Sequence, residues 1–246
     1  MSAPANPTAP VATDIILKVR NVSKRFGGVQ AVDDASLQVE RGKVTGVIGP
    51  NGSGKSTMFN LITGLSVPDN GQIIYKGQDI AGKQPHAINR MGMGRTFQLT
   101  RLFETMTVLE NLTVVTKDSF RGAEALAEGL LENLGLTRLK HEYASNLSYG
   151  QQKLVEFLRL SMIESDLILL DEPFAGVNPV MEKKLLEQIE VWVREGKTIL
   201  LTDHEMAIMM ELCESIFVFD YGSVIAHGTP AAVREDPRVM EAYFGS

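Results

Sequence analysis

Residues 49–57 fit the phosphate-binding pattern G-x-x-x-x-G-K-[ST] without a gap, and this feature restricts the fold more than any other. A polyphosphate needs many backbone N–H donors pointing at it, and only glycines let the main chain curl that closely. Lys55 is expected to reach the outer phosphates, and the Ser56 hydroxyl is expected to bind Mg²⁺. The residues predicted to line this nucleoside-triphosphate site are Gly49, Asn51, Gly52, Ser53, Gly54, Lys55, Ser56 and Thr57.

The residues on either side of this loop predict a strand followed by a helix. Val44–Ile48 is an apolar run of the kind found in buried strands. Met58, Leu61 and Ile62 repeat at helical spacing, and Gly64 is expected to end the helix. The anion would then lie at a helix N-terminus, where N–H groups and the helix dipole both favour negative charge. The structural alternative is a glycine-rich turn that binds nothing.

Length and composition describe a globular cytoplasmic protein. The 246 residues can bury a sizeable core in one or two domains. No apolar run approaches the roughly 18 residues that a membrane span needs. Met1–Pro10 has neither the basic start nor the apolar centre of a signal peptide, so residues 1–13 are predicted to be a disordered tail. A net charge of −6 with scattered basic residues argues against a nucleic-acid partner.

Two further apolar runs predict buried strands that end in polar side chains. Leu167–Leu170 precedes Asp171 and Glu172, and Thr198–Thr202 precedes Asp203 and His204. Ligands bind at the carboxyl ends of the strands in an open α/β sheet. Asp171 is expected in the Mg²⁺ shell, and Glu172 is expected to take a proton from an attacking water. Helix capping is the alternative for the acids, and a structural role is the alternative for the histidine.

The remaining segments predict two smaller units. Ile15–Val22, Ala31–Val39 and Gly71–Gly77 have the pattern of strands, which would form a small lobe. Helical periodicity without a strand pattern runs from Leu99 to about Ile163, in Val108–Val115, Ala123–Leu134 and Leu154–Ile163, which predicts an inserted helical subdomain.

Two residues within these segments have more than one interpretation. Ser148 precedes an apolar helical stretch and is expected to cap that helix. Phe26 lies ahead of the glycine loop, in a predicted turn with Gly27 and Gly28. An aromatic ring there would stack on the base of a nucleotide, although its sequence context alone favours a core residue.

Several separate motifs resemble the ATP-binding cassette family in sequence, spacing and order. The resemblance covers about residues 14–246 and implies ATP and Mg²⁺ as cofactors. The motifs are the glycine loop, Gln98, Leu147-Ser148-Tyr149-Gly150-Gln151, Asp171-Glu172 and His204.

The resemblance also implies roles for single residues. Phe26 matches the aromatic that stacks on adenine, and Gln98 matches the glutamine that binds Mg²⁺ and links it to the transmembrane partner. Glu172 matches the catalytic base, and His204 matches the catalytic-site histidine that contacts the γ-phosphate. The signature that closes over ATP from the opposite subunit matches Ser148, Gly150 and Gln151.

One branch of the family matches best. The segments Gly94–Phe103, Met106–Leu112 and Ala144–Gln152 are similar to the ATPase subunits of branched-chain amino-acid importers. Tyr149 stands where most cassettes have glycine, and Asn178 stands where most have aspartate; both substitutions are familiar in this branch.

We therefore expect an α/β protein with a P-loop NTPase core of the RecA type, an antiparallel β lobe and a helical subdomain. The core and β lobe would comprise residues 14–98 and 164–246, and the helical subdomain residues 99–163. The resemblance implies ATP hydrolysis that drives amino-acid import. It also implies permease subunits, a second cassette and, indirectly, a solute-binding protein as partners, with the chain on the inner face of the membrane. Lipopolysaccharide export and a soluble ATPase of the same fold remain alternatives.

Overall fold

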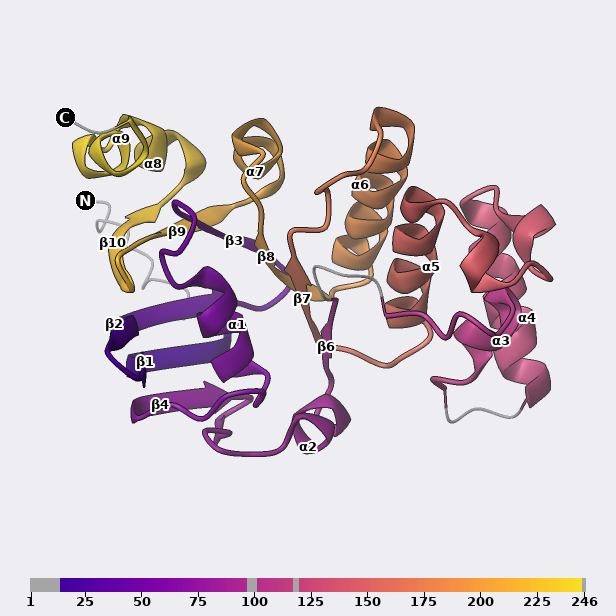
Figure 1. Cartoon of the computed structure of the whole chain (residues 1–246), viewed down its shortest axis with the longest axis horizontal. Coiled ribbons are helices and arrows are strands. Elements are labelled where there is room, and N and C mark those ends of the chain that lie inside the picture. The colour runs from indigo at the N-terminus through magenta and orange to yellow at the C-terminus, as the bar shows by residue number, and fades with distance from the viewer. Residues whose placement is uncertain (1–13, 97–100, 117–119, 245–246) are drawn as a thin grey trace, which may run out of the picture.

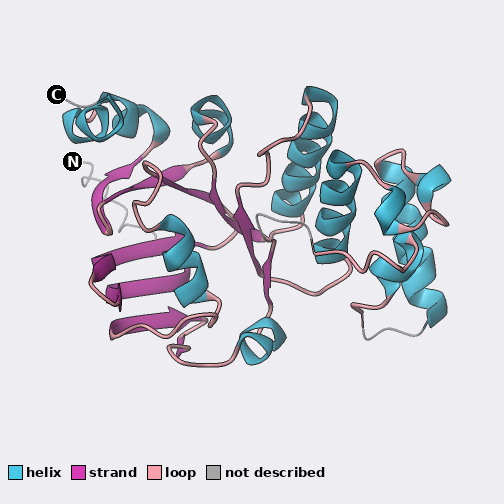
Figure 2. Cartoon of the chain, viewed as in Figure 1, coloured by secondary structure: helices cyan, strands magenta, loops and turns pink. Residues whose placement is uncertain are grey.

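Two sheets organise the chain in the computed structural model, which describes residues 14–96, 101–116 and 120–244 (Figure 1). Within those residues the larger sheet has six strands in the order β10-β9-β3-β8-β7-β6, and the smaller has four in the order β2-β1-β4-β5 (Figure 2). The strands are β1 (Ile15–Phe26), β2 (Val29–Glu40), β3 (Val44–Ile48), β4 (Asn70–Tyr75), β5 (Gln78–Asp79), β6 (Met93–Arg95), β7 (Leu167–Asp171), β8 (Thr198–Thr202), β9 (Ser215–Asp220) and β10 (Ser223–Gly228).

Helices cover both faces of the larger sheet and form a separate group at one end of the molecule (Figure 1). The helices are α1 (Lys55–Ile62), α2 (Pro85–Arg90), α3 (Val108–Thr113), α4 (Phe120–Asn133), α5 (Tyr149–Ser161), α6 (Pro179–Arg194), α7 (Met206–Leu212), α8 (Pro230–Glu235) and α9 (Pro237–Phe244). Short 3-10 turns occur at Thr137–Leu139 and Ala144–Asn146.

The larger sheet has the parallel core that the sequence predicts. β3 pairs in parallel with β8 and β9, and β7 pairs in parallel with β8 and β6. Every residue of β3, β7 and β8 is buried, because layers on both faces exclude water from these strands. The smaller sheet is antiparallel throughout its described pairs. The predicted α/β class with an antiparallel lobe is confirmed.

The two faces of the larger sheet pack against different partners. Because side chains alternate along a strand, Leu169 packs with Phe59 of α1 in the cluster shared with the smaller sheet. Leu170 faces the other way and packs with Phe157 of α5 and Trp192 of α6, whose rings stack 5.3 Å apart. Therefore α1 and α5 lie on opposite faces of the sheet.

The predicted elements differ from the observed ones mainly at their ends, whereas the strands β5, β6, β9 and β10 were not predicted. β1 continues through Phe26, so this residue ends a strand and only Gly27 and Gly28 form the turn. The three-residue strand β6 was not predicted, because so short a segment shows no alternation. α5 begins at Tyr149, five residues before the apolar run at Leu154, because polar residues fill its first turn.

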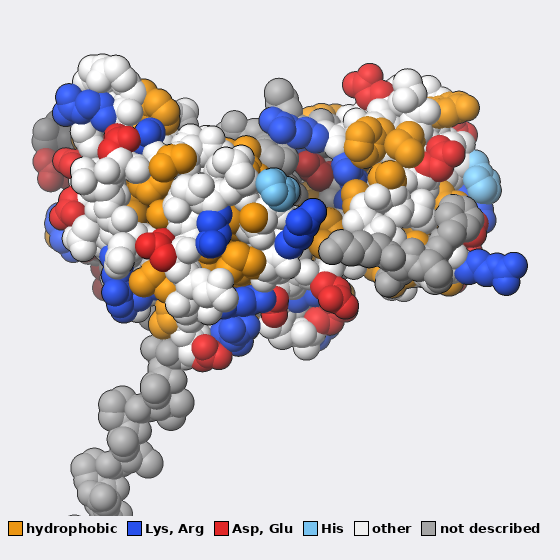
Figure 3. Space-filling view, turned by 90° about the horizontal axis from the view of Figure 1, so that it is seen from below, with side chains coloured by type: hydrophobic (Ala, Val, Ile, Leu, Met, Phe, Trp, Pro, Cys, Tyr) orange, Lys and Arg blue, Asp and Glu red, His pale blue; other side chains and the backbone are white. Residues whose placement is uncertain are grey.

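The surface has no predominant charge sign on the face shown in Figure 3, where basic and acidic side chains are interspersed. None of the helices in the described part of the chain is both long and apolar enough to cross a membrane. The predicted tail, residues 1–13, lies outside the described residues, and so does Gln98.

Candidate functional site

The glycine loop connects β3 to α1 as predicted, and its glycines are required by close packing. Gly49 has a φ of 151°, and a Cβ there would lie 2.1 Å from the Phe219 carbonyl oxygen. Gly54 has a φ of 108°, and its Cβ would lie 2.5 Å from the Ala31 carbonyl oxygen. Any side chain at either position would therefore displace the backbone of a neighbouring strand or loop.

Lys55 lies in the first turn of α1 and bends back over the loop. Its Nζ donates hydrogen bonds to the Gly49 and Pro50 carbonyl oxygens at 2.7 and 2.9 Å. Only 7% of the residue is exposed. Burial lowers the pKa of the ammonium group, and the negative charges of Glu172 and Asp171 oppose that shift. These two carboxylates therefore face the same site as Lys55.

The loop has the donors that a polyphosphate requires. Gly54 is the N-cap of α1 and offers no side chain to the first N–H groups of the helix. The Ser53 hydroxyl is buried, and no described group hydrogen-bonds to it. Unpaired donors beside a partly desolvated ammonium group fit an anion with several oxygens.

Asp171 ends β7 with both carboxylate oxygens engaged. Its Oδ1 accepts a hydrogen bond from the Thr202 hydroxyl at 3.1 Å, and its Oδ2 accepts one from the Arg95 guanidinium at 2.8 Å. The residue is 3% exposed. This carboxylate is therefore held in one orientation at the carboxyl edge of the sheet, a position and chemistry that fit the shell of a divalent cation.

Glu172 follows in an unusual backbone conformation. Its φ of 48° lies in the left-handed region, which is uncommon for a residue other than glycine. Its N–H donates to the Thr202 carbonyl oxygen at 2.9 Å, which holds the turn. Strained residues of this kind gather at functional sites, where the surrounding structure fixes them.

His204 reaches the same edge from β8. Its Nδ1 lies 3.9 Å from Glu172 Oε1, and its side chain is 58% exposed. Asp203 fixes both loops that meet here: its Oδ1 accepts from the His204 N–H at 2.8 Å, and its Oδ2 accepts from the Phe174 N–H at 3.3 Å. The structure therefore brings together Lys55, Asp171, Glu172 and His204, as the strand order implies.

The predicted signature forms the start of α5. Ser148 caps the helix in a reciprocal pair with Gln151, whose side-chain oxygen accepts from the Ser148 N–H at 2.9 Å. The capping prediction is confirmed. Gly150 packs against α6, where a Cβ would lie 3.1 Å from Met181 Cγ. These residues therefore belong to a helix that packs on the other face of the sheet from α1, the helix that begins at the glycine loop.

The two positions that depart from the common family pattern have local contacts. The Tyr149 ring packs near Gly176, whose Cβ would lie 3.3 Å from the ring. Asn178 is the N-cap of α6, and its Oδ1 accepts hydrogen bonds from the N–H groups of Val180 and Met181, both at 3.1 Å. Asparagine is as good a cap as aspartate here.

Phe26 lies on the surface at the end of β1. Half of it is exposed, and the Lys24 ammonium lies 5.4 Å from its ring centroid. The interpretation of Phe26 as a core residue is therefore wrong. The ring remains a candidate for stacking on a base.

Comparison with known proteins identifies the family. A protein-family model described as "ABC transporter" matches residues 32–175. A second family model, described as "Branched-chain amino acid ATP-binding cassette transporter", matches residues 223–246. The chain belongs to the ABC transporter family. It is 38% identical to the probable branched-chain amino acid transport ATP-binding protein LivG of Archaeoglobus fulgidus, over 94% of this chain and 96% of that protein.

Further members of the ABC transporter family are similar over nearly the whole chain. The high-affinity LivG protein of Escherichia coli K12 is 39% identical, over 94% of this chain and 98% of its own length. A crystal structure of an ABC transporter cassette in its ADP conformation is 35% identical and superposes with a TM-score of 0.83, over 95% of this chain and 100% of that one. A crystal structure of a nucleotide-free cassette is 35% identical and superposes with a TM-score of 0.83, over 94% of this chain and 100% of that one.

Three positions of this ABC cassette were missed by sequence reasoning. Arg95 pairs with Asp171, Thr202 hydrogen-bonds to it, and Asp203 fastens the loop of His204. Asp203 and Thr202 adjoin a predicted site residue, so their position at the strand end was a usable signal. Nothing in the sequence indicated the role of Arg95, because its partner Asp171 lies 76 residues away.

Proposed function

We propose that this chain is the ATP-hydrolysing subunit of an importer for branched-chain amino acids, held at the inner face of the membrane by a permease. The agreement of two matches carries the proposal: the LivG proteins are similar over 94% of the chain, and the separate branched-chain model matches residues 223–246. In this proposal residues 99–163 form the helical subdomain, and residues 14–98 and 164–246 form the core and β lobe.

The site residues have separate roles in the proposed reaction. Lys55 and the loop N–H groups hold the phosphates, and Ser56 and Asp171 hold the cation. Mg²⁺, when bound, would neutralise charge on the phosphate oxygens. Glu172 accepts a proton from the attacking water, and His204 beside it contacts the terminal phosphate. Gln98 is proposed to link the cation site to the permease.

We further propose that a second cassette completes the site. Ser148, Gly150 and Gln151 lie at the start of α5, on the other face of the sheet from α1. A helix N-terminus favours an anion, so this end of α5 is suited to a γ-phosphate held by the glycine loop of another subunit. The second cassette is a copy of this chain or a sister subunit.

Reconstitution tests the transport function directly. The chain would be co-expressed with its permease subunits, and the complex placed in lipid vesicles with the solute-binding protein. ATP hydrolysis should rise when leucine, isoleucine or valine is added with that binding protein. Stimulation by lipopolysaccharide, without a response to these amino acids, would instead favour the export alternative.

Base stacking at Phe26 leads to a prediction about nucleotide choice. A ring recognises the π-face shared by all bases, so GTP should compete with ATP to within about tenfold. Phe26→Ala should weaken binding of both by about 1–3 kcal/mol. Val29→Ala is the matched control, because Val29 is exposed and pairs with Phe26 across the hairpin. A strict preference for ATP in competition binding would mean that a polar group recognises adenine.

We propose that the segment 98–110, which leads into α3, docks a helix of the permease. Phe103 is 49% exposed, although its backbone is fixed on both sides by Asn111: its N–H donates to Asn111 Oδ1 at 2.9 Å, and its carbonyl accepts from Asn111 Nδ2 at 3.0 Å. The Arg159 guanidinium lies 5.2 Å from the ring centroid. An exposed aromatic ring on an ordered backbone, beside a cation, is typical of binding surfaces.

Charge substitution tests this docking surface. Phe103→Glu should weaken assembly with the permease at least about tenfold and abolish transport, because a hydrated carboxylate would replace the apolar ring and would have to lose water in the interface. The control is Leu126→Glu, an exposed apolar position on α4. Binding is measured by co-purification and titration of detergent-solubilised permease. Unchanged assembly and transport in Phe103→Glu would show that the ring only seals the subdomain.

A further inference from the structure

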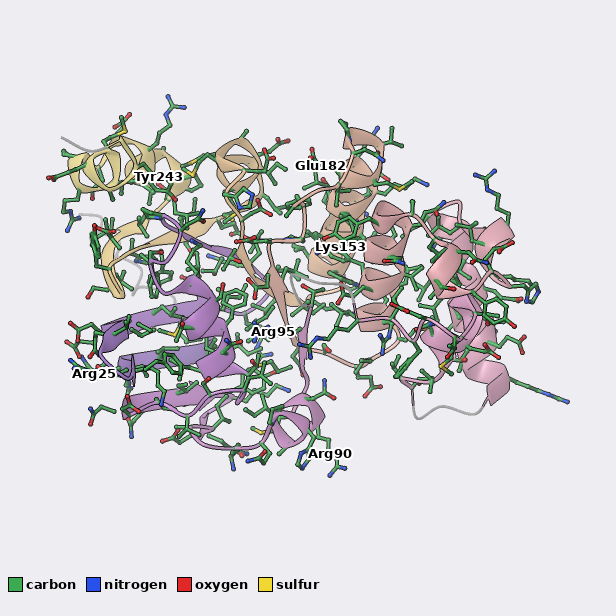
Figure 4. All side chains as sticks on the ribbon, in the orientation of Figure 1. Arg25, Arg90, Arg95, Lys153, Glu182 and Tyr243 are labelled. Atoms are coloured by element: carbon green, nitrogen blue, oxygen red, sulfur yellow. The ribbon has the colours of Figure 1, made fainter. Side chains whose placement is uncertain are left out.

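Arg95 connects the two elements that hold the proposed phosphate and cation sites. Its NH2 group donates to Asp171 Oδ2 at 2.8 Å, and its NH1 group donates to Asn60 Oδ1 at 2.9 Å and Thr63 Oγ1 at 2.8 Å. Asn60 lies in α1 and Thr63 is its C-cap. In Figure 4 the Arg95 label lies between α1 and the strands β6 and β7. One guanidinium therefore links the phosphate-loop helix to the end of β7.

This ion pair is almost fully shielded from water. The side chains of Arg95 and Asp171 are 8% and 4% exposed. A shielded carboxylate needs a positive partner, because an uncompensated buried charge is strongly destabilising. With the Thr202 hydroxyl on Oδ1, both oxygens of Asp171 accept hydrogen bonds from the protein. A divalent cation approaching Asp171 therefore meets a carboxylate that already has a cationic partner.

Arg95 donates to three acceptors among the described residues, and these suggest what happens when a cation arrives. A guanidinium that loses Asp171 still donates to Asn60 and Thr63, and it lies 5.8 Å from the Phe59 ring centroid. Arg95 can thus release Asp171 without becoming a buried charge that lacks hydrogen bonds. Asp171, for its part, gains a cation in place of the guanidinium.

We propose that Arg95 is the counter-ion of Asp171 when no divalent cation is bound, and that it competes with the cation for this carboxylate. The proposal rests on the cation-binding role given to Asp171 above. Arg95 then acts as a positioning residue, which sets how much Mg²⁺ the site needs. Through α1 it also makes the cation site sensitive to the helix that begins at the phosphate loop.

The experiment measures the free Mg²⁺ concentration that stabilises the ATP-loaded protein. Thermal unfolding of the full chain is followed at saturating ATP while free Mg²⁺ is buffered from zero upward, for the wild type and Arg95→Met. The Mg²⁺ midpoint is the free Mg²⁺ concentration at which half of the Mg²⁺-dependent rise in melting temperature is reached. This midpoint should fall by about tenfold in Arg95→Met, which corresponds to about 1.4 kcal/mol, because the guanidinium no longer competes for Asp171. Without Mg²⁺ the same variant should melt at a lower temperature than the wild type. An unchanged or higher midpoint would overturn the proposal.

Two further variants keep the result interpretable. Lys76→Met also removes one ion-paired cation, but its partner is Asp166 on the surface, so its midpoint should match that of the wild type. Arg95→Lys keeps the charge and loses the planar fork, and its midpoint should fall by at least about twofold. If Arg95→Met does not fold, the test rests on Arg95→Lys. An unchanged Mg²⁺ midpoint in Arg95→Lys would then overturn the proposed competition between Arg95 and Mg²⁺ for Asp171.

The wild type separates this proposal from the function on which it rests. If ATP stabilises the wild type equally with and without Mg²⁺, the cation-binding role of Asp171 is wrong, and the proposed competition with Arg95 is wrong as well. If the stability of the ATP-loaded wild type depends on Mg²⁺ but the Arg95 variants have the same Mg²⁺ midpoint, only the proposed competition between Arg95 and Mg²⁺ is wrong.

Discussion

Glu172→Gln is expected to bind ATP about as well as the wild type and to hydrolyse it about 10²–10⁴-fold more slowly. The amide keeps the shape of the side chain but cannot accept a proton from water. The backbone of residue 172 should be undisturbed. Its hydrogen bond to the Thr202 carbonyl oxygen and its left-handed φ of 48° involve only main-chain atoms. Steady-state phosphate release and equilibrium ATP binding measure the two effects separately.

The same variant should collect in a closed, ATP-loaded dimer. If Ser148 and Gly150 complete the site of another subunit, hydrolysis is what opens the pair, and a chain that cannot hydrolyse stays paired. Sedimentation with ATP and Mg²⁺, with and without the sister subunit, measures this. Glu187→Gln, an exposed position on α6, is the control and should remain active. A monomer in both mixtures, or wild-type turnover, would refute the shared site or the role of Glu172.

Lys55→Ala should raise the dissociation constant for ATP by at least about a hundredfold while the protein stays folded. The ammonium group supplies the only side-chain cation of the loop, and methyl cannot replace it. Folding should be little affected, because burial already disfavours the charged form of Lys55, as its lowered pKa indicates. The loss of two hydrogen bonds to the Gly49 and Pro50 carbonyls is offset by access of water to the opened loop.

Calorimetric titration with ATP and circular dichroism test this prediction together. Lys183→Ala removes an exposed lysine of α6 and should bind ATP as the wild type does. A folded Lys55→Ala protein with near-normal affinity would show that residues 49–57 do not hold the phosphates.

The parts of the fold that sequence patterns predicted are those built from local signals. β3, β7 and β8 are continuous apolar runs because they are buried on both faces, and the glycine loop is a contiguous motif. The order of parallel strands then places Lys55, Asp171 and His204 at one edge. Ser148 was recognisable as a cap because it precedes an apolar helical stretch, and its reciprocal partner, Gln151, is only three residues away.

The parts that were missed depend on contacts between distant residues. Arg95 meets Asp171 only because β6 pairs with β7, and three residues carry too little pattern to reveal that pairing. The sequence context of Phe26 alone favoured the core, because aromatic residues are usually buried there, whereas its exposure depends on where β1 ends relative to the sheet edge. Gln98 lies outside the described residues, so its role stays a prediction.

Asp203 has a consequence for protein engineering. Its single carboxylate fastens the loop after β8 through His204 and the loop after β7 through Phe174. A designer who grafts the Glu172 loop into another scaffold must therefore transplant the Asp203 loop with it, at the same strand spacing. Grafted alone, the first loop would lose the bond that sets its path, and Glu172 would no longer be held beside an imidazole.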